Sequence, residues 1–381
     1  MENVIVTEKK PIKLWLSDIE DGALQQAKDL ANLPFVYKHI AIMPDSHQGY
    51  GMPIGGVMAT EGVIVPNAVG VDIGCGMATV KTSLTDIDTD TIKKIMQRIR
   101  DLVPVGFEHQ KESQQWDGFD EAPDLKIIQQ ELESAKKQLG TLGGGNHFIE
   151  IQKGDDGHVW LMLHSGSRNF GLKTASEYHK KAQYLCEKWF SVIPNKDLSF
   201  LPIESQEGND YYKAMNYCLR FAKANRELMM NRVIGALFQE TGASVLWDLD
   251  IHHNYVVFEH HFGKDVLVHR KGATRARAGE PGIIPGSMGT NSYITEGLGN
   301  EDSFMSSSHG AGRRMGRNEA VKTLNLADEQ NKMAGIVHGL RTAKDLDESP
   351  GAYKDIDVVM ENQKDLVNIL HKLTPLASIK G

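Results

Sequence analysis

The chain has 381 residues, of which 40% are hydrophobic and 24% are charged, and its formal net charge is −8. These values are typical of a water-soluble globular protein with a large core. No apolar run approaches the length of a membrane span, and the N-terminus lacks the basic-then-apolar order of a signal peptide. Three scattered cysteines do not form a disulfide framework, so we expect a cytoplasmic protein with no membrane partner. Because the net charge is negative, a polyanionic partner must be held by local basic clusters.

Apolar runs predict strands mainly in the first two thirds of the chain. The predicted strands cover residues 12–16, 38–45, 56–60, 62–66, 147–150, 158–164, 255–258 and 266–269. Helical spacing of apolar residues predicts a first helix through Ala23, Ala27 and Leu30, which Ser17 could cap. Further helices are predicted at residues 88–103, 125–139, 173–191, 209–240, 317–335, 340–346 and 357–373.

Nothing in the chain marks a domain boundary. It contains no internal repeat, no low-complexity segment and no linker, and residues 108–122 are the nearest to a loose insertion. The candidate site residues described below are spread from Asp72 to His309, so dividing the chain would divide the site. We therefore expect one large α+β domain over residues 1–381, in which helices surround mixed sheets.

An aspartate and a cysteine lie close together in the glycine-rich stretch of residues 67–77. Asp72 offers a hard oxygen ligand, and Cys75 offers a soft thiolate three residues later. The glycines on both sides of Cys75 let the backbone bend tightly and let other groups approach. This spacing is weak evidence alone, because a cysteine beside glycine is more often a small buried packing residue.

Histidines elsewhere in the chain strengthen the metal interpretation. His147, His164 and His253 each lie in a glycine-rich or polar string. One such histidine is more often a hydrogen-bonded polar residue, but one carboxylate, one thiol and three imidazoles together favour two ions that share the thiolate. His252 competes with His253, and strand alternation lets only one of them face the site. The ligand types suggest zinc or another transition metal and leave manganese open.

Basic residues recur in Gly/Ser-rich strings that we expect to form loops. They are Arg168, Lys271, Arg275, Arg277, Arg313, Arg314 and Arg317. Guanidinium groups on such loops suit bidentate contacts to phosphate. Any one of them could equally belong to an ordinary solvated surface, and the phosphate interpretation is favoured where an arginine follows a candidate ligand within a few residues.

His309 lies in a different kind of string, with serines before it and glycines and arginine after it. A histidine there could ligate a metal, act as an acid or base, or attack a phosphorus atom, and the spacing does not choose among these roles. Gly310 and Gly312 would let backbone N–H groups approach a phosphate, although the chain has no Walker motif.

Several of these strings, in this order, resemble those of the RtcB family of RNA-splicing ligases. They are VDIGCGM at 71–77, GGNHFIE at 144–150, HSGSR at 164–168, HNY at 253–255, PGSMG at 285–289, HGAGR at 309–313 and YKDI at 353–356. The resemblance runs from about residue 13 to residue 381. It implies an RtcB-like fold with the active site in a central cleft. It also implies GTP- and manganese-dependent joining of RNA 3′-phosphate or 2′,3′-cyclic phosphate ends to 5′-hydroxyl ends, as in RNA repair or tRNA splicing.

Carried over residue by residue, the resemblance implies specific roles. Two manganese ions would be held by Asp72, Cys75, His147, His164 and His253, with Cys75 bridging. His309 would be guanylylated by GTP, and the reaction would continue through an RNA 3′-guanylate. The GMP pocket would be lined by Asn146, Glu150, Ser287, Ser292, Gly310, Ala311, Gly312, Tyr353 and Lys380. RNA or phosphate would be handled by Arg168, Lys271 and Arg317. We expect a monomer, and the need for a helper protein and the role of the turn at Asp45 and His47 are left open.

Two other functions fit parts of the pattern. A dinuclear metallo-phosphodiesterase or phosphatase would use the same ligands without a covalent histidine. A nucleic-acid-binding protein with a structural metal would have a closed, four-coordinate site, which Cys75 and three histidines could build. The additional carboxylate of Asp72 and the arginines in the loops argue against that second alternative.

Overall fold

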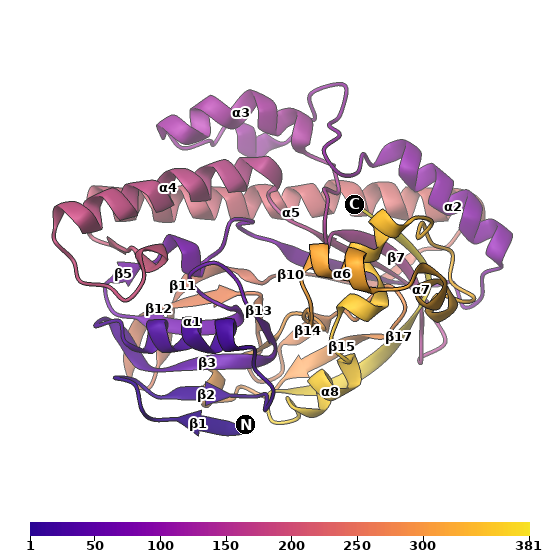
Figure 1. The fold of residues 1–381 in the computed structure, drawn as a ribbon. Helices are drawn as coiled ribbons and strands as arrows, with labels where there is room; N and C mark the ends of the chain where they lie inside the picture. The colour runs from indigo at the N-terminus through magenta and orange to yellow at the C-terminus, as the bar shows by residue number, and fades with distance from the viewer.

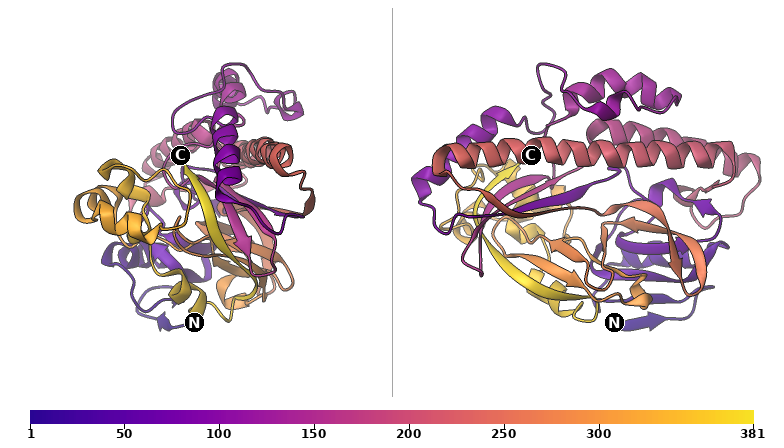
Figure 2. Two further views of the ribbon diagram at one scale, coloured as in Figure 1. Left: turned by 90° about the vertical axis from the view of Figure 1, so that its right-hand side faces the viewer. Right: turned by 180° about the vertical axis from the view of Figure 1, so that it is seen from behind.

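The computed structural model describes all residues from Met1 to Gly381. Most strands belong to two sheets that lie next to each other (Figures 1 and 2). The first sheet is mixed and has the order β1 (Asn3–Ile5), β2 (Ile12–Leu14), β3 (Val36–His47), β4 (Ile54–Thr60), β12 (Lys264–Lys271) and β11 (Asn254–His261). The second is antiparallel, with the order β10 (Val245–His252), β6 (Gly76–Thr82), β8 (Val159–Ser165), β7 (Phe148–Gly154), β17 (Val367–Lys380), β15 (Ser292–Gly297) and β14 (Pro281–Ile284). Two short pairs complete the strands, β5 (Val63–Ile64) with β9 (Leu201–Pro202) and β13 (Ala273–Arg275) with β16 (Ser306–Ser308).

Helices from the middle of the chain form a layer over the sheets. They are α2 (Thr89–Leu102), α3 (Lys126–Gln138), α4 (Arg168–Lys188) and α5 (Gln206–Thr241). Helix α5 has 36 residues and extends across nearly the full width of the molecule (Figure 2). The side chain of Ser205 caps its first turn, and Gly242 ends it in the left-handed conformation with φ 70°. Helix α5 packs directly on β6 and β8, while α4 and then α3 lie outside it (Figure 1).

The remaining helices are short and lie at the two ends of the chain. They are α1 (Asp21–Ala31), α6 (Arg317–Thr323), α7 (Leu326–Lys332) and α8 (Ile356–Glu361). Apolar side chains of α2, α5 and the second sheet form one core, and those of α3, α4 and α5 form another. The architecture is the predicted α+β class, and no helix is both long and apolar enough to cross a membrane.

The helix prediction for residues 357–373 is wrong over its second half. Helix α8 ends at Glu361, and residues from Val367 onward form β17. Strand β17 pairs with β7 on one side and β15 on the other. This non-local pairing satisfies the backbone of the segment on both edges, and it overrides the local helical spacing of Leu366, Ile369 and Leu370. Ile369 and Leu370 are about half exposed, so they do not form the buried helical face that the spacing suggested.

Three other boundaries differ from the predictions. Residues 317–335 form two helices because Asn325 caps α7 with its side chain and thereby interrupts a continuous helix. Residues 343–348 form a 3₁₀ helix in place of the predicted α-helix at 340–346. The first helix begins at Asp21, so Ser17 does not cap it. The remaining predicted helices and strands are confirmed to within a few residues.

Candidate active site

Four candidate ligands lie at the same end of four neighbouring strands of the second sheet. Cys75 directly precedes β6, His147 directly precedes β7, and His164 is the last residue but one of β8. In the antiparallel register Phe148 pairs with His164, and Gly76 pairs with Ser165, which brings these strand ends together. His253 lies between β10 and β11, where the chain passes from the second sheet to the first.

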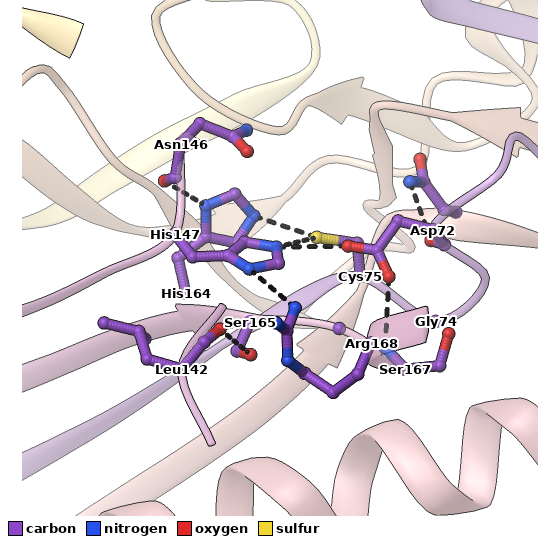
Figure 3. A network of polar contacts seen from close by, with 12 residues as sticks. Asp72, Gly74, Cys75, Leu142, Asn146, His147, His164, Ser165, Ser167 and Arg168 are labelled. Carbon is purple, nitrogen blue, oxygen red and sulfur yellow. Dashed lines mark hydrogen bonds and ion pairs between the residues drawn. The ribbon is translucent and has the colours of Figure 1, made fainter. Parts of the chain in front are cut away.

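The donor atoms of these four side chains converge, and Figure 3 shows Cys75, His147 and His164. The Sγ atom of Cys75 lies 3.4 Å from Nε2 of His147 and 3.2 Å from Nε2 of His164. The Nε2 atoms of His164 and His253 are 3.3 Å apart. Asp72 joins the group, because its Oδ2 is 3.1 Å from Nε2 of His147. All are buried apart from Asp72, whose side chain is 28% exposed.

The hydrogen bonds around the cluster fit a metal site. Nδ1 of His164 donates to the carbonyl oxygen of Asn146 at 3.0 Å, so its Nε2 carries the lone pair that faces Cys75 and His253. A ligating histidine characteristically donates its other N–H to a carbonyl or carboxylate in this way. Three imidazole nitrogens and a thiol that face one another cannot all satisfy each other by hydrogen bonding. A cation between them would.

Burial shifts the ionisation of these groups. It lowers the pKa of His164 and His253 well below the ordinary histidine value, and neighbouring histidines lower it further. Burial and the charge of Asp72 raise the pKa of the Cys75 thiol well above its ordinary value. Burial also raises the pKa of Asp72, but the hydrogen bond and charge of His147 outweigh it, and the net shift is downward. In the metal-free site the imidazoles of His164 and His253 are therefore neutral and Cys75 is a thiol, so metal binding must release the thiol proton.

His309 adjoins the cluster without belonging to it. It follows β16, and its ring centroid is 4.7 Å from that of His253. Both its backbone N–H and its Nδ1 donate to Oδ2 of Asp45, at 3.1 and 2.7 Å. Asp45 is fully buried, and the close approach requires glycine at position 312, where a Cβ atom would lie 2.0 Å from the Asp45 carbonyl oxygen. In the neutral ring this contact keeps the proton on Nδ1, which leaves Nε2 of His309 with a free lone pair.

A cavity of about 220 Å³ brings most of the predicted site residues together. Its lining includes Asp72, Cys75, His164, His253, His309, Asn146, Gly310, Ala311, Gly312, Tyr353, Arg317 and Lys380. A second cavity of about 440 Å³ shares Lys380 with it and is lined by Gly145, Met288, Glu348 and Ser378, among others. Together the two cavities leave room for a ligand much larger than a metal ion.

Two residues predicted for the nucleotide pocket, Glu150 and Ser292, form a buried polar group with Gln152, and neither of them lines either cavity. Glu150 and Ser292 both accept hydrogen bonds from the side-chain amide of Gln152, at 2.8 and 3.1 Å. Burial raises the pKa of Glu150 to about 7, against the opposing charge of Lys380. Ser287 is also buried but bonds to Thr290, and it does not line either cavity.

The predicted phosphate-binding residues are placed differently from one another. Arg317 lines the smaller cavity, and its Nε donates to Glu348 at 3.0 Å. Nη1 of Arg168 is 3.5 Å from Nδ1 of His147, which places this guanidinium behind the ligand (Figure 3). Lys271 does not lie in a loop. It ends β12, is buried, and donates to the carbonyl oxygens of Tyr50 and Asn67 at 2.5 and 2.9 Å.

The sequence did not reveal two groups of the site. Asp45 lies in β3 and not in the expected turn, and its contact with His309 spans 264 positions of the chain and has no local signal. Glu348 lies in an ordinary acidic stretch, yet it accepts hydrogen bonds from Arg313, Arg317 and the hydroxyl of Tyr353. The HGAGR motif and the arginine-rich string after it were the indirect signals for such a partner.

Comparisons with known proteins place the chain in one family. The family model described as tRNA-splicing ligase RtcB matches residues 26–124 and 113–381. The RNA-splicing ligase RtcB of Escherichia coli (strain K12) is 40% identical over 407 positions, covering 99% of this chain and 99% of that protein. The tRNA-splicing ligases RtcB of Thermococcus kodakarensis and Nanoarchaeum equitans are 34% and 32% identical, over 95% and 97% of this chain and 92% and 95% of their own lengths. The chain with this cluster of cysteine, histidines and aspartate therefore belongs to the RtcB family of RNA-splicing ligases.

Proposed function

We propose that residues 1–381 act as one catalytic domain that joins an RNA 3′-phosphate or 2′,3′-cyclic phosphate end to a 5′-hydroxyl end, consuming GTP. The observation that carries the proposal is the position of His309. Asp45 holds its Nδ1, and the ring borders the same cavity as Asp72, Cys75 and His253. All three cysteines of the chain are buried and unpaired, which supports a role in the reducing cytoplasm.

Asp72, Cys75, His147, His164 and His253 are the residues that would hold two manganese ions, with the Cys75 thiolate shared between them. Bound there, the ions would supply positive charge that offsets charge developing on phosphoryl oxygens and would orient the pyrophosphate leaving group. The convergent donor atoms and the neutral imidazoles support this role. The proposed ligand set is complete without His309, so the imidazole of His309 can act as a nucleophile.

His309 is the proposed nucleophile. Its Nε2 lone pair attacks the α-phosphorus of GTP, so that an N–P bond forms and the bond to pyrophosphate breaks. An oxygen of the RNA 3′-phosphate then attacks the same phosphorus and breaks the N–P bond, which transfers GMP to the RNA. The 5′-hydroxyl attacks the activated RNA phosphate and expels GMP. A 2′,3′-cyclic phosphate must first be opened by hydrolysis. Throughout, Asp45 keeps the imidazole in one tautomer and stabilises its positive charge.

The guanosine is proposed to bind across Lys380 and the buried polar group of Glu150, Gln152 and Ser292. Lys380 lines both cavities, and its ammonium could donate to the carbonyl oxygen of guanine. Asn146, Glu150, Ser287, Ser292 and Tyr353 complete the proposed pocket, with the backbone of residues 310–312 facing the phosphate. Arg317 is the proposed phosphate contact in the cavity. Arg168 is proposed to act through His147, whose ring it contacts. Lys271 is proposed to act through the backbone carbonyls of Tyr50 and Asn67, to which it donates hydrogen bonds.

A ligation assay separates this function from the metallohydrolase alternative. The substrates are one RNA with a 3′-phosphate and another with a 5′-hydroxyl, with manganese, in the presence and absence of GTP. A ligase yields joined RNA only when GTP is present. A phosphatase releases inorganic phosphate in both conditions and joins nothing, and that result would overturn the proposal.

Cys75→Ala should be inactive at any manganese concentration, because a shared thiolate serves both coordination spheres.

A further inference from the structure

Arg226 of helix α5 is one of the largest fully buried side chains in the molecule. A guanidinium carries five N–H hydrogens, and here each has an acceptor. Nε and one hydrogen of Nη2 donate to the two carboxylate oxygens of Asp250, at 2.7 and 2.6 Å. Nη1 donates to the carbonyl oxygens of Gly74 and Ser165, at 2.8 and 3.0 Å. The last hydrogen of Nη2 goes to Nδ1 of His252 at 3.0 Å.

The three partners other than Asp250 share one property. Each is the immediate chain neighbour of a proposed metal ligand: Gly74 precedes Cys75, Ser165 follows His164, and His252 precedes His253. Figure 3 shows Gly74 and Ser165 beside the cluster. One guanidinium therefore connects three segments, from the ends of β6, β8 and β10, that each carry one ligand.

The surrounding backbone is built closely around this group. A Cβ atom at position 76 would lie 3.1 Å from the Cζ and Nη1 atoms of Arg226 and 2.1 Å from the carbonyl oxygen of Ile251. Only glycine fits there. One turn earlier on the same face of α5, the Cβ of Ala222 would be 2.9 Å from a Cβ at position 74. Helix α5 therefore touches both flanks of Cys75.

We propose that Arg226 is a positioning residue that sets the distances among Cys75, His164 and His253. It does not reach the reacting atoms. It fixes the backbone that carries the three ligand side chains, so that their donor atoms lie close together before a metal binds. This inference rests on the proposed metal ligands. The alternative is that Arg226 only anchors α5 to the sheet, in which case its loss would cost stability but leave metal affinity unchanged.

Arg226→Lys is the informative substitution. Lysine keeps the charge, but its ammonium has three hydrogens on a single atom and cannot reproduce a planar five-bond fork. Arg232→Lys is the matched control. Arg232 lies on the same helix, and its guanidinium also donates to backbone carbonyls, those of Leu102 and Gly140, but it contacts no neighbour of Cys75, His164 or His253.

The measurement is a titration of the purified full-length proteins with cobalt(II), with urea unfolding recorded in parallel. Cobalt reports on the ligands directly through its thiolate charge-transfer and d–d absorption bands. We expect Arg226→Lys to bind cobalt about 10- to 100-fold more weakly and with altered bands, which is the usual effect of losing a partner that orients metal ligands. Arg232→Lys should keep wild-type affinity and wild-type bands, whatever loss of stability the urea unfolding records.

Wild-type affinity and bands in Arg226→Lys would overturn the proposal, and so would an equal loss in Arg232→Lys. If Arg226→Lys does not fold, Asp250→Asn decides, because it weakens the carboxylate that orients the guanidinium. It should shift cobalt affinity in the same direction, and no shift would overturn the proposal. Failure of the wild-type protein to show a thiolate–cobalt band would instead contradict the proposed metal ligands themselves.

Discussion

Asp45 controls which nitrogen of His309 can react. Its carboxylate accepts from both the backbone N–H and Nδ1 of His309, so the ring is fixed in orientation and in tautomer. A carboxylate in this position would also stabilise the positive charge that the imidazole acquires in the proposed attack on phosphorus. The pair therefore resembles the aspartate–histidine arrangement of hydrolytic triads, with histidine as the proposed nucleophile.

We predict that Asp45→Asn slows guanylylation of His309 by about 10²- to 10⁴-fold, because an amide can donate to Nδ1 and favour the wrong tautomer. The rate of adduct formation with excess GTP measures the effect. Cobalt affinity is the internal control and should stay at the wild-type value. An Asp45→Asn enzyme that forms its adduct at the normal rate would show that the carboxylate has no part in the reaction.

Glu150 predicts a pH dependence of stability. Its pKa is raised from 4.5 to about 7 by burial, so between these values the folded state holds a proton that the unfolded state has lost. The contribution of this group to the free energy of unfolding is therefore fully present below pH 4.5 and decreases as the pH rises toward 7. Above pH 7 it no longer changes. A rise in pKa from 4.5 to about 7 corresponds to a loss of stability on the order of 3 kcal/mol.

Glu150→Gln removes this titration while keeping the shape of the side chain. The free energy of unfolding of the variant should exceed that of the wild type increasingly from pH 5 to pH 7, and the difference should then level off. Urea unfolding of both proteins across this range measures the difference. If it does not change with pH, the carboxyl group of Glu150 is ionised at pH values well below 7.

At the residue scale, the sequence predicted the clustered side chains better than the residues that support them. Cys75, His164 and His253 stand in short strings of glycine and polar residues, because donor atoms at strand ends need tight turns around them. Asp45 and Glu348 lie in strings with no such composition. Their partners are far away in the sequence, and only folding brings the two together.

Strand β17 shows the same limit at the scale of an element. The sequence suggested a helix that anchors a short tail, but the tail is itself a strand between β7 and β15. Lys380 pairs with Phe148, and the backbone N–H of Gly381 donates to the carbonyl oxygen of His147 at 3.1 Å. Local spacing cannot reveal a strand whose partner residues, such as Gly297 for Val367, lie at least 70 positions away in the chain. The long amphipathic and buried segments, such as α5, could be predicted because their pattern is local.

This placement of the tail yields a prediction for Lys380. Its ammonium lies 5.0 Å from the centroid of the Phe148 ring and borders both cavities. We predict that Lys380→Ala slows guanylylation and weakens the preference for GTP over ATP, because adenine offers an amino donor where guanine offers a carbonyl. Sealing of RNA that already carries a 3′-terminal guanylate should suffer less, since the base is then tethered.

The control for Lys380→Ala is deletion of Gly381 alone. That deletion removes the hydrogen bond to the His147 carbonyl but keeps the ammonium. It should affect metal affinity more than nucleotide preference. A Lys380→Ala enzyme that still rejects ATP at the wild-type level would remove Lys380 from guanine recognition.

At the scale of the whole molecule, the site depends on how the two sheets meet. The second sheet supplies Cys75, His147 and His164, and His253 lies where the chain crosses to the first sheet. Asp45, on β3 of the first sheet, then reaches His309. The sequence predicted the α+β class and named the residues that cluster at the site, but it did not predict this meeting of two sheets, because the order of strands in a sheet is set by long-range pairing.

The overall negative charge is compatible with a polyanionic substrate, because basic groups are concentrated locally at the cavity. Arg313 and Arg317 both bond to Glu348 at 3.0 Å, so the basic groups are concentrated and held at the cavity while the chain as a whole carries a net charge of −8. The field that a phosphate meets is set by this local arrangement more than by the sum of all charges.

The most direct test of the proposed function is a search for the covalent adduct. The wild-type protein is incubated with manganese and with GTP radiolabelled on the α-phosphate, and His309→Ala is treated in parallel. The wild type should form a protein–GMP adduct that is labile in acid and stable in alkali, as a phosphoramidate is. His309→Ala should form none while its metal content stays at the wild-type level. No adduct on the wild type, an adduct that persists in His309→Ala, or a variant that loses its metal would contradict the assignment of His309 as the nucleophile.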